Sequence, residues 1–130
     1  MRKVRIHPVE DIAWTTIRAR AGTPAPKVFE YLADSELDSS MTFHEFGNAS
    51  EMQLAELKYL PGAEAVVHKH EDDEIIYVVS GQMHFGNQVL QAGSSIYIPG
   101  NTFYGFKAGP DGLRIVNFRA RADVSFESRT

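Results

Sequence analysis

The sequence predicts an all-β domain built from many short strands. Ten glycines and six prolines divide its 130 residues at short intervals, and the segments between them are rich in Val, Ile, Phe, Tyr and Thr, which favour strands. Because an open sheet of so many strands would leave unpaired edges, we expect the strands to close into a sandwich or a barrel. A chain of 14.5 kDa is expected to form one domain.

Turn residues separate the expected strands. In chain order, these strands cover residues 13–17, 27–32, 41–46, 52–60, 65–70, 74–80, 82–85, 88–90, 95–98, 103–106 and 113–119. The turns include Pro61-Gly62, Glu71-Asp72-Asp73, Gly86-Asn87, Pro99-Gly100-Asn101 and Gly109-Pro110-Asp111-Gly112. Residues 50–60 fit a helical period as well, but the flanking turn favours a strand. The polar segment 33–40 is expected to be a solvated connector, with a mobile lid as the alternative.

Composition excludes several classes of function. The chain carries 13 basic and 17 acidic residues, for a net charge of −4, and has no basic block that would follow a phosphate backbone. It has no cysteine, which excludes disulfides, thiolate zinc sites and cysteine nucleophiles. The N-terminus lacks the apolar run of a signal peptide, and no apolar stretch approaches the ~20 residues of a membrane span. We therefore expect a cytoplasmic protein without nucleic-acid or membrane partners.

Two histidines stand two residues apart in Val67-His68-Lys69-His70, so on a strand both imidazoles project from the same face. Glu74 would lie ~13 Å from His70 on an extended chain, too far to share an ion. A reversal at residues 71–73 would return Glu74 to the histidines and create a facial metal site with open positions. The alternative is an edge strand with surface histidines and a solvated acidic turn.

These residues belong to a longer pattern, Gly62-x5-His68-x-His70-x3-Glu74-x6-Gly81. The pattern fills every fixed position of the first motif of the cupin superfamily, and the chain is therefore similar to a small single-domain cupin over about residues 52–118. The second cupin motif is matched in part: Gly93 and Pro99 are present, whereas Asn101, Tyr104 and Ala108 replace a glycine, a histidine and an asparagine. Asn101 is a mild change, because asparagine tolerates left-handed backbone.

The resemblance implies a cupin-type double-stranded β-helix, a conical barrel or jelly roll of two antiparallel sheets. The domain would span residues 1–130, with N-terminal strands and a loop in 1–50, the barrel in 51–120 and a tail in 121–130. His68, His70 and Glu74 would hold one divalent transition metal, Fe²⁺ first and Mn²⁺, Ni²⁺ or Zn²⁺ as alternatives. A further ligand is a histidine in family members with an intact second motif, and Tyr104 stands in its place.

Tyr104 has three interpretations. It would ligate as a phenolate, donate a hydrogen bond or proton to a bound substrate as a catalytic residue, or pack against its neighbours. Among the other histidines, His7 is expected to be exposed and His44 faces either way. His84 is a spare ligand that we leave outside the metal site.

The strand at residues 74–80 is apolar on both faces, since Ile75, Tyr77 and Val79 alternate with Ile76 and Val78. Something must cover its outer face. A second subunit is the expected cover, so the sequence predicts a homodimer, and the alternative is the chain's own N-terminal strands.

Three functions remain open. The first is a metalloenzyme of the dioxygenase or C–C-cleaving type that acts on a small, oxygen-rich, chelating substrate. The second is a non-catalytic module that binds or senses a small molecule. The third is an isomerase, epimerase or lyase that uses acid–base chemistry, with a histidine as base and Tyr104 as acid.

Overall fold

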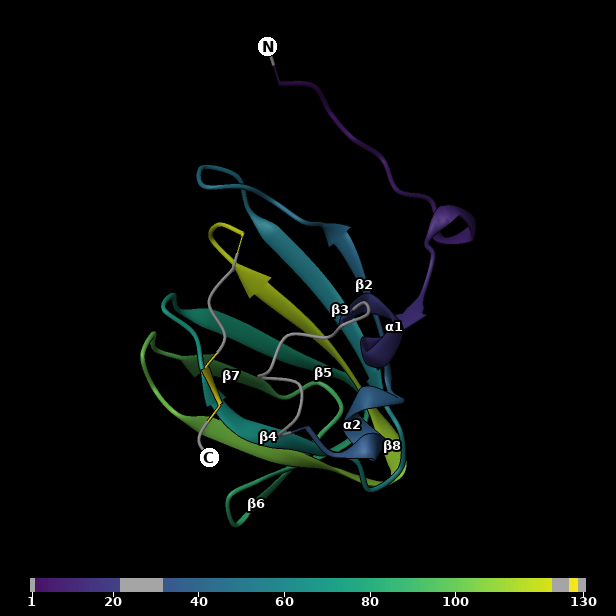
Figure 1. Ribbon diagram of the computed structural model, residues 1–130, viewed down its shortest axis with the longest axis vertical. Helices are drawn as coiled ribbons and strands as arrows, with labels where there is room; N and C mark the ends of the chain where they lie inside the picture. Colours follow the sequence, from purple (N-terminus) through teal and green to yellow (C-terminus); the bar gives the residue numbers. More distant parts are fainter. Residues whose placement is uncertain (1, 22–31, 123–126, 129–130) are drawn as a thin grey trace.

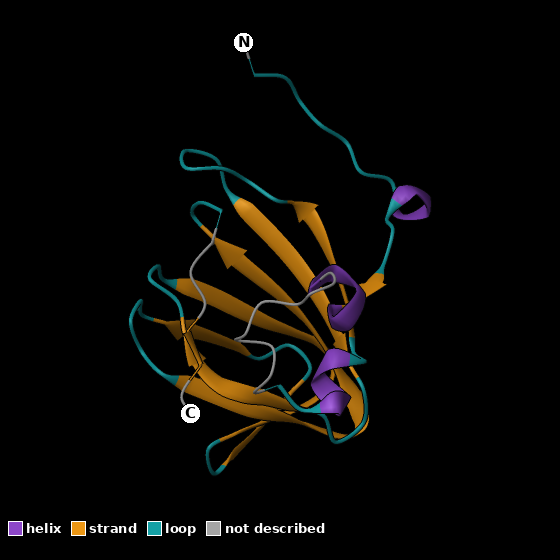
Figure 2. Cartoon of the chain, in the orientation of Figure 1, coloured by secondary structure: helices purple, strands orange, loops and turns teal. Residues whose placement is uncertain are grey.

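The fold is the all-β barrel that the sequence predicts (Figures 1 and 2). The computed structural model describes residues 2–21, 32–122 and 127–128. Its elements are η1 (Val9–Asp11), β1 (Thr15–Thr16), α1 (Ile17–Ala21), α2 (Asp34–Leu37), β2 (Ser40–Glu45), β3 (Gln53–Tyr59), β4 (Glu64–Lys69), β5 (Glu74–Phe85), β6 (Gln88–Gln91), β7 (Ser95–Ile98), β8 (Tyr104–Arg119) and β9 (Glu127–Ser128). No helix among these residues is long and apolar enough to cross a membrane.

Two long antiparallel strands, β5 and β8, run through both layers of the barrel. In the first layer, the second half of β8 lies between β3 and the first half of β5. β7 pairs with the other side of β5, and β2 and β1 extend the layer beyond β3. In the second layer, the first half of β8 lies between β4 and the second half of β5. β6 pairs with the other side of β5, and β9 pairs with the other side of β4. The two layers are therefore joined by the same two strands.

The structure corrects the predicted breaks in these two strands. The sequence predicts a break between strands at Gly81 and a turn at residues 109–112, but β5 and β8 continue through both places. Gly81 pairs with Leu113 and Met83 with Ala108, so residues 109–112 bulge opposite Gln82. A Cβ at Gly81, whose φ is +76°, would stand 2.1 Å from the carbonyl oxygen of Gly112. The turn-forming residues therefore bend the long strands between the layers, as bulges do, without ending them.

Two short helices replace predicted strand and loop near the N-terminus. Of the expected strand at 13–17, Thr15–Thr16 form β1, and Ile17–Ala21 form α1, in which alanine and arginine favour the helix. The expected solvated connector at 33–40 is wrong, because it contains α2 and buries Glu36, Leu37 and Ser39. The predicted strand at 27–32 lies outside the described residues except for Leu32, which is not in a strand.

The barrel interior is apolar at its centre and polar at one end. The centre is formed by fully buried apolar side chains, those of Ile76, Val78, Met83 and Ile115. The polar end lies where β3 and β5 begin and where β4 and β8 end. Gln53, the first residue of β3, pairs there with Arg119, the last residue of β8. The buried polar side chains that gather at this end make up the candidate site.

The outer face of the layer that contains β7, β5 and β8 carries an apolar patch. Its side chains are between 37% and 59% exposed and belong to Ile75, Tyr77, Val79, Tyr97 and Phe118. The chain's own N-terminal segment covers a different part of this layer: Trp14 lies over Lys58 of β3, with the Nζ atom 3.9 Å from the ring centroid. In the described residues the patch therefore remains exposed, and an exposed apolar area of this kind favours association.

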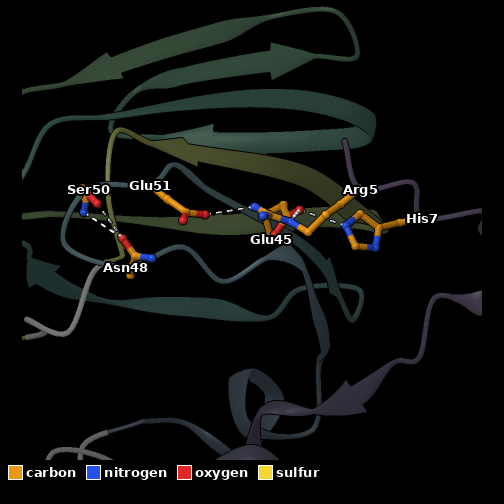
Figure 3. A network of polar contacts seen from close by, with 6 residues as sticks. All are labelled: Arg5, His7, Glu45, Asn48, Ser50 and Glu51. Atoms are coloured by element: carbon orange, nitrogen blue, oxygen red, sulfur yellow. Dashed lines mark hydrogen bonds and ion pairs between the residues drawn. The ribbon is translucent and has the colours of Figure 1, made fainter. Parts of the chain in front are cut away.

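The N-terminal arm extends from the barrel (Figure 1) and is held by charged contacts (Figure 3). Arg5 Nε lies 2.6 Å from Glu45 Oε1, Arg5 Nη2 lies 3.0 Å from Glu51 Oε2, and His7 Nε2 lies 3.0 Å from Glu45 Oε1. Hydrogen bonds from Arg5 and His7 lower the pKa of Glu45 to about 2. The side chain of Ile6, between the two basic residues, is 80% exposed, so the arm presents an apolar side to solvent.

We expect the protein to be a homodimer that buries this patch, because association removes its apolar side chains from water. Ile75→Asp should shift the molecular mass measured by light scattering from that of a dimer to that of a monomer. Val89→Asp is the matched control, since Val89 is exposed on β6, outside the patch. A monomeric wild-type protein would contradict the prediction.

Candidate functional site

The structure brings the four sequence-predicted site residues together at the polar end of the barrel. His68 of β4 pairs with Tyr104 of β8, and their ring centroids are 4.4 Å apart. The ring of His70 lies 4.9 Å from that of His68 at 87°. Tyr104 donates a hydrogen bond to Oε1 of Glu74, the first residue of β5. All four side chains are buried, with exposed fractions of 2–9%.

The predicted reversal at residues 71–73 is present and is held by the loop before β8. Asp73 Oδ1 accepts the backbone N–H of Gly100 at 2.7 Å, and the N–H of Asn101 donates to the carbonyl oxygen of His70 at 2.7 Å. Asn101 has a φ of +59°, the left-handed conformation expected for this replacement of glycine. This packing places Glu74 beside His70, as the turn predicts.

Tyr104 is a buried hydrogen-bond donor. Burial raises its pKa well above the usual value, and the negative charge of Glu74 and the hydrogen bond to it act in the same direction. With these neighbours the phenol keeps its proton throughout the pH range of a working protein. The role of Tyr104 as a ligand, as a donor to a bound substrate or as a packing residue stays a prediction.

Sequence analysis missed two residues of the site, Asn117 and Arg119 of β8. Arg119 Nη2 donates to Glu74 Oε2 at 2.7 Å and lies 3.3 Å from His70 Nε2, while Nη1 donates to Gln53 Oε1 at 3.0 Å. Asn117 Nδ2 lies 3.4 Å from the same oxygen of Glu74. The signal was available, because Leu113 and Ile115 alternate inward on this strand and the same period places 117 and 119 inside.

Two polar atoms of this cluster remain unpaired. Asn117 Oδ1 and Arg119 Nε are buried and have no hydrogen-bond partner among the described residues. Buried polar groups are paired in most proteins, because an unmade hydrogen bond costs about 1–3 kcal/mol. One acceptor atom and one donor atom of the cluster therefore have no partner among the described residues.

The residues that the sequence predicts as metal ligands do not fit a metal in this arrangement. Their chemistry is suitable, since two imidazoles and a carboxylate bind first-row metals. However, Oε1 of Glu74 is taken by Tyr104 and Oε2 by Arg119, whose guanidinium also lies against His70. In the part of the chain that the structure describes, no group of three or more acidic, histidine or cysteine side chains is arranged to hold an ion. Metal binding by His68, His70 and Glu74 stays a prediction.

A second buried carboxyl group lies beside β4. Glu36 of α2 is 6% exposed, and its Oε1 atom accepts the backbone N–H of Val66 at 3.0 Å. Burial raises the pKa of Glu36 to about 7, although the bond from Val66 acts in the opposite direction. Burial raises the pKa of Tyr59, and the charge of Glu36 acts in the same direction. Near neutral pH this carboxyl group therefore takes up or releases a proton inside the fold.

Glu36 should make the folded state less stable as the pH rises from 4.5 to 7. Over this interval the unfolded chain releases the proton while the folded chain keeps it, so the free energy of unfolding falls, by about 3 kcal/mol in full. Glu36→Gln should remove this fall, as measured by urea unfolding at several pH values. Glu64→Gln on the exposed part of β4 is the control, and parallel curves for wild type and Glu36→Gln would contradict the prediction.

The remaining histidines lie away from the site. His44 of β2 contacts Glu56 Oε1 at 2.8 Å, and the same carboxylate binds Arg114. His84 follows the fully buried Met83 on β5, so alternation turns it to the other face of the strand.

Comparison with known proteins identifies the fold family. Residues 55–116 match the cupin domain. An RmlC-like cupin protein from Ralstonia eutropha JMP134 superposes with a TM-score of 0.69 at 16% identity, covering 97% of this chain and 80% of that one. An RmlC-like cupin from Shewanella frigidimarina NCIMB 400 gives 0.56 at 27% identity, covering 63% and 76%.

A third similar structure is the polyketide cyclase RemF from Streptomyces resistomycificus, with a TM-score of 0.58 at 23% identity, covering 69% of this chain and 71% of that one. No curated protein sequence matches this chain. The domain match includes the strands that carry the two histidines, Glu74 and Tyr104, and the similar structures share the barrel. Residues 55–116 of this chain are therefore a cupin domain, set in a cupin-type barrel.

Proposed function

We propose that this protein is an enzyme that binds one small polar organic molecule at the polar end of the barrel and transfers a proton on it, as lyases and isomerases do. One observation carries the proposal: the neutral phenol of Tyr104 is buried beside an imidazole, a carboxylate and a guanidinium. A fixed donor next to a base is the arrangement that general acid–base catalysis requires.

His68 is the base in this proposal. Its Nδ1 atom lies 2.5 Å from the carbonyl oxygen of Val66. A carbonyl oxygen only accepts, so this contact assigns the proton to Nδ1 and makes Nε2 the basic nitrogen of the neutral ring. Tyr104, whose ring lies 4.4 Å away between centroids, is the acid. A substrate bound against both His68 Nε2 and the Tyr104 hydroxyl would lose a proton to His68 and gain one from Tyr104, whose hydrogen bond would pass from Glu74 to the substrate.

Arg119 and Asn117 bind the substrate in this proposal. The unpaired Nε–H of Arg119 donates to a carboxylate or enolate oxygen, and the unpaired Oδ1 of Asn117 accepts from a hydroxyl group. The positive charge of Arg119 stabilises negative charge that develops on the substrate when the proton leaves. The substrate class that fits is a small, oxygen-rich acid or enol. The similar polyketide cyclase has the same type of barrel, and a shared fold does not choose the reaction here.

Proton transfer can be tested without knowledge of the product. The protein is incubated in D₂O with a panel of small carboxylic acids, β-dicarbonyl compounds and enols, and loss of C–H signals is followed by NMR. His68→Asn should abolish exchange, because asparagine keeps a donor for Val66 and removes the basic nitrogen. His84→Asn, away from the site, should exchange normally. A panel member that binds without exchange would support the binding or sensor module instead.

The metal-dependent function remains the second candidate, because the spacing of His68, His70 and Glu74 is that of a facial metal site. Dioxygenation or C–C cleavage would be its reaction type. It predicts about one divalent first-row metal per chain, which His70→Ala would abolish. The experiment that closes the next subsection tests whether the protein binds this metal.

A further inference from the structure

Arg119 already fills the cation position of the predicted metal site. Its Nη2 atom lies 2.7 Å from Glu74 Oε2 and 3.3 Å from His70 Nε2. An ion bound to both atoms would need distances of about 2.0–2.2 Å, so it would compete with this nitrogen for the same two partners. A guanidinium group is a cation, as a divalent metal ion is.

The position of Arg119 is built into the fold. It ends β8 opposite Gln53, the first residue of β3, and Gln53 Oε1 accepts from Nη1 at 3.0 Å. Gln53 is 1% exposed and Arg119 is 7% exposed. The backbone register and the buried amide of Gln53 therefore direct the guanidinium toward Glu74. If the guanidinium moved away, the buried Oε1 atom of Gln53 would lose its hydrogen-bond donor.

Both carboxylate oxygens of Glu74 accept hydrogen bonds from side chains of this protein. Tyr104 donates to Oε1, while Arg119 and Asn117 approach Oε2. Its negative charge is balanced by the Arg119 guanidinium at 2.7 Å. Tyr104 stands where the second cupin motif has a histidine. The replacement therefore puts a hydrogen-bond donor to the Glu74 carboxylate in the place of a metal ligand. The same carboxylate that the first motif offers to a metal is here contacted by three side chains of β8.

We propose that Arg119 replaces a metal ion as the cation of this site and that the folded protein binds no metal there. The inference concerns the cofactor and does not depend on which reaction the protein catalyses. It implies that the ability to bind a metal is suppressed by one residue and returns when that residue is removed, because the imidazole and carboxylate atoms themselves are retained.

The test is a gain of metal binding. Wild-type protein purified after growth with Fe, Mn, Ni and Zn should contain far less than one metal per chain by elemental mass spectrometry. Arg119→Met frees the two ligand atoms and removes a unit charge close to the ion, so Zn²⁺ and Mn²⁺ affinity measured by calorimetry should rise by roughly 100-fold or more. His70→Ala in the Arg119→Met background should abolish the gain.

Arg121→Met is the matched control, because Arg121 makes the same kind of carboxylate contact with Asp72 at the surface and should leave metal affinity unchanged. If Arg119→Met does not fold, the wild-type protein still decides: its melting temperature should be insensitive to a chelator. Wild-type protein that retains one metal per chain, and loses it in His70→Ala, overturns the proposal without bearing on the proton-transfer assay.

Discussion

Glu74→Gln is expected to lower the free energy of unfolding by about 3–5 kcal/mol, because it leaves the buried guanidinium of Arg119 without its counter-charge. The amide keeps an oxygen for Tyr104, but its NH₂ group offers no acceptor to Arg119. Urea unfolding followed by circular dichroism measures the loss, with the slope of the transition as a check that the unfolded state is unchanged.

The double variant Glu74→Gln with Arg119→Gln tests whether the loss comes from the unpaired charge. Removing both charges should recover part of the stability, with a coupling energy of up to about 3 kcal/mol in the double-mutant cycle. The surface pair of Asp72 and Arg121 is the control cycle, since exposed ion pairs contribute about 1 kcal/mol or less. Additive losses in the buried cycle would show that the two side chains do not stabilise each other.

Tyr104→Phe should reduce turnover by about 100-fold or more while the fold is retained, because it removes the acid and leaves the aromatic ring in place. The deuterium-exchange assay supplies the rate, and thermal unfolding supplies the check on the fold. Tyr59→Phe is the matched control: Tyr59 is also buried, packs against Phe106 with ring centroids 5.3 Å apart, and carries no role in the proposed reaction.

The outcome separates the three interpretations of Tyr104. Lower turnover with unchanged metal content identifies a proton or hydrogen-bond donor. Lower metal occupancy identifies a ligand and would support the metal-dependent function. Equal turnover in wild type and Tyr104→Phe, measured at saturating substrate, reduces Tyr104 to packing and contradicts the acid role.

The sequence predicts the barrel and four of the six residues of the candidate site, and it misses Asn117 and Arg119. Alternation places His68 and His70 on one face, and the acidic turn returns Glu74 to them, because both depend on local periodicity and turn chemistry. Tyr104 is found by its place in a motif. The lengths of β5 and β8 are not predictable in this way. Residues 109–112 have the composition of a turn, but they form a bulge because the segments of β8 on both sides of them pair with β5.

The contacts of Arg119 could not be predicted from local sequence patterns. Its inward position follows from the alternation of β8, but its partners come from β3, β5 and the end of β4, and their proximity depends on register across the whole barrel. A sequence pattern reports which side chains share a face. It does not report that a cation from a distant strand meets the carboxylate of a metal-binding motif.

The contacts that build the site span long stretches of the chain, and this has a consequence for folding. Tyr104 and Glu74 are separated by 30 residues, Arg119 and Glu74 by 45, and Arg119 and Gln53 by 66. Closing loops of this length costs entropy that local hairpins such as β5–β6 do not pay. A partly folded chain that has formed its hairpins therefore has no site, and the arrival of β8 against β3 and β5 creates the buried cluster in the same step that completes the native barrel.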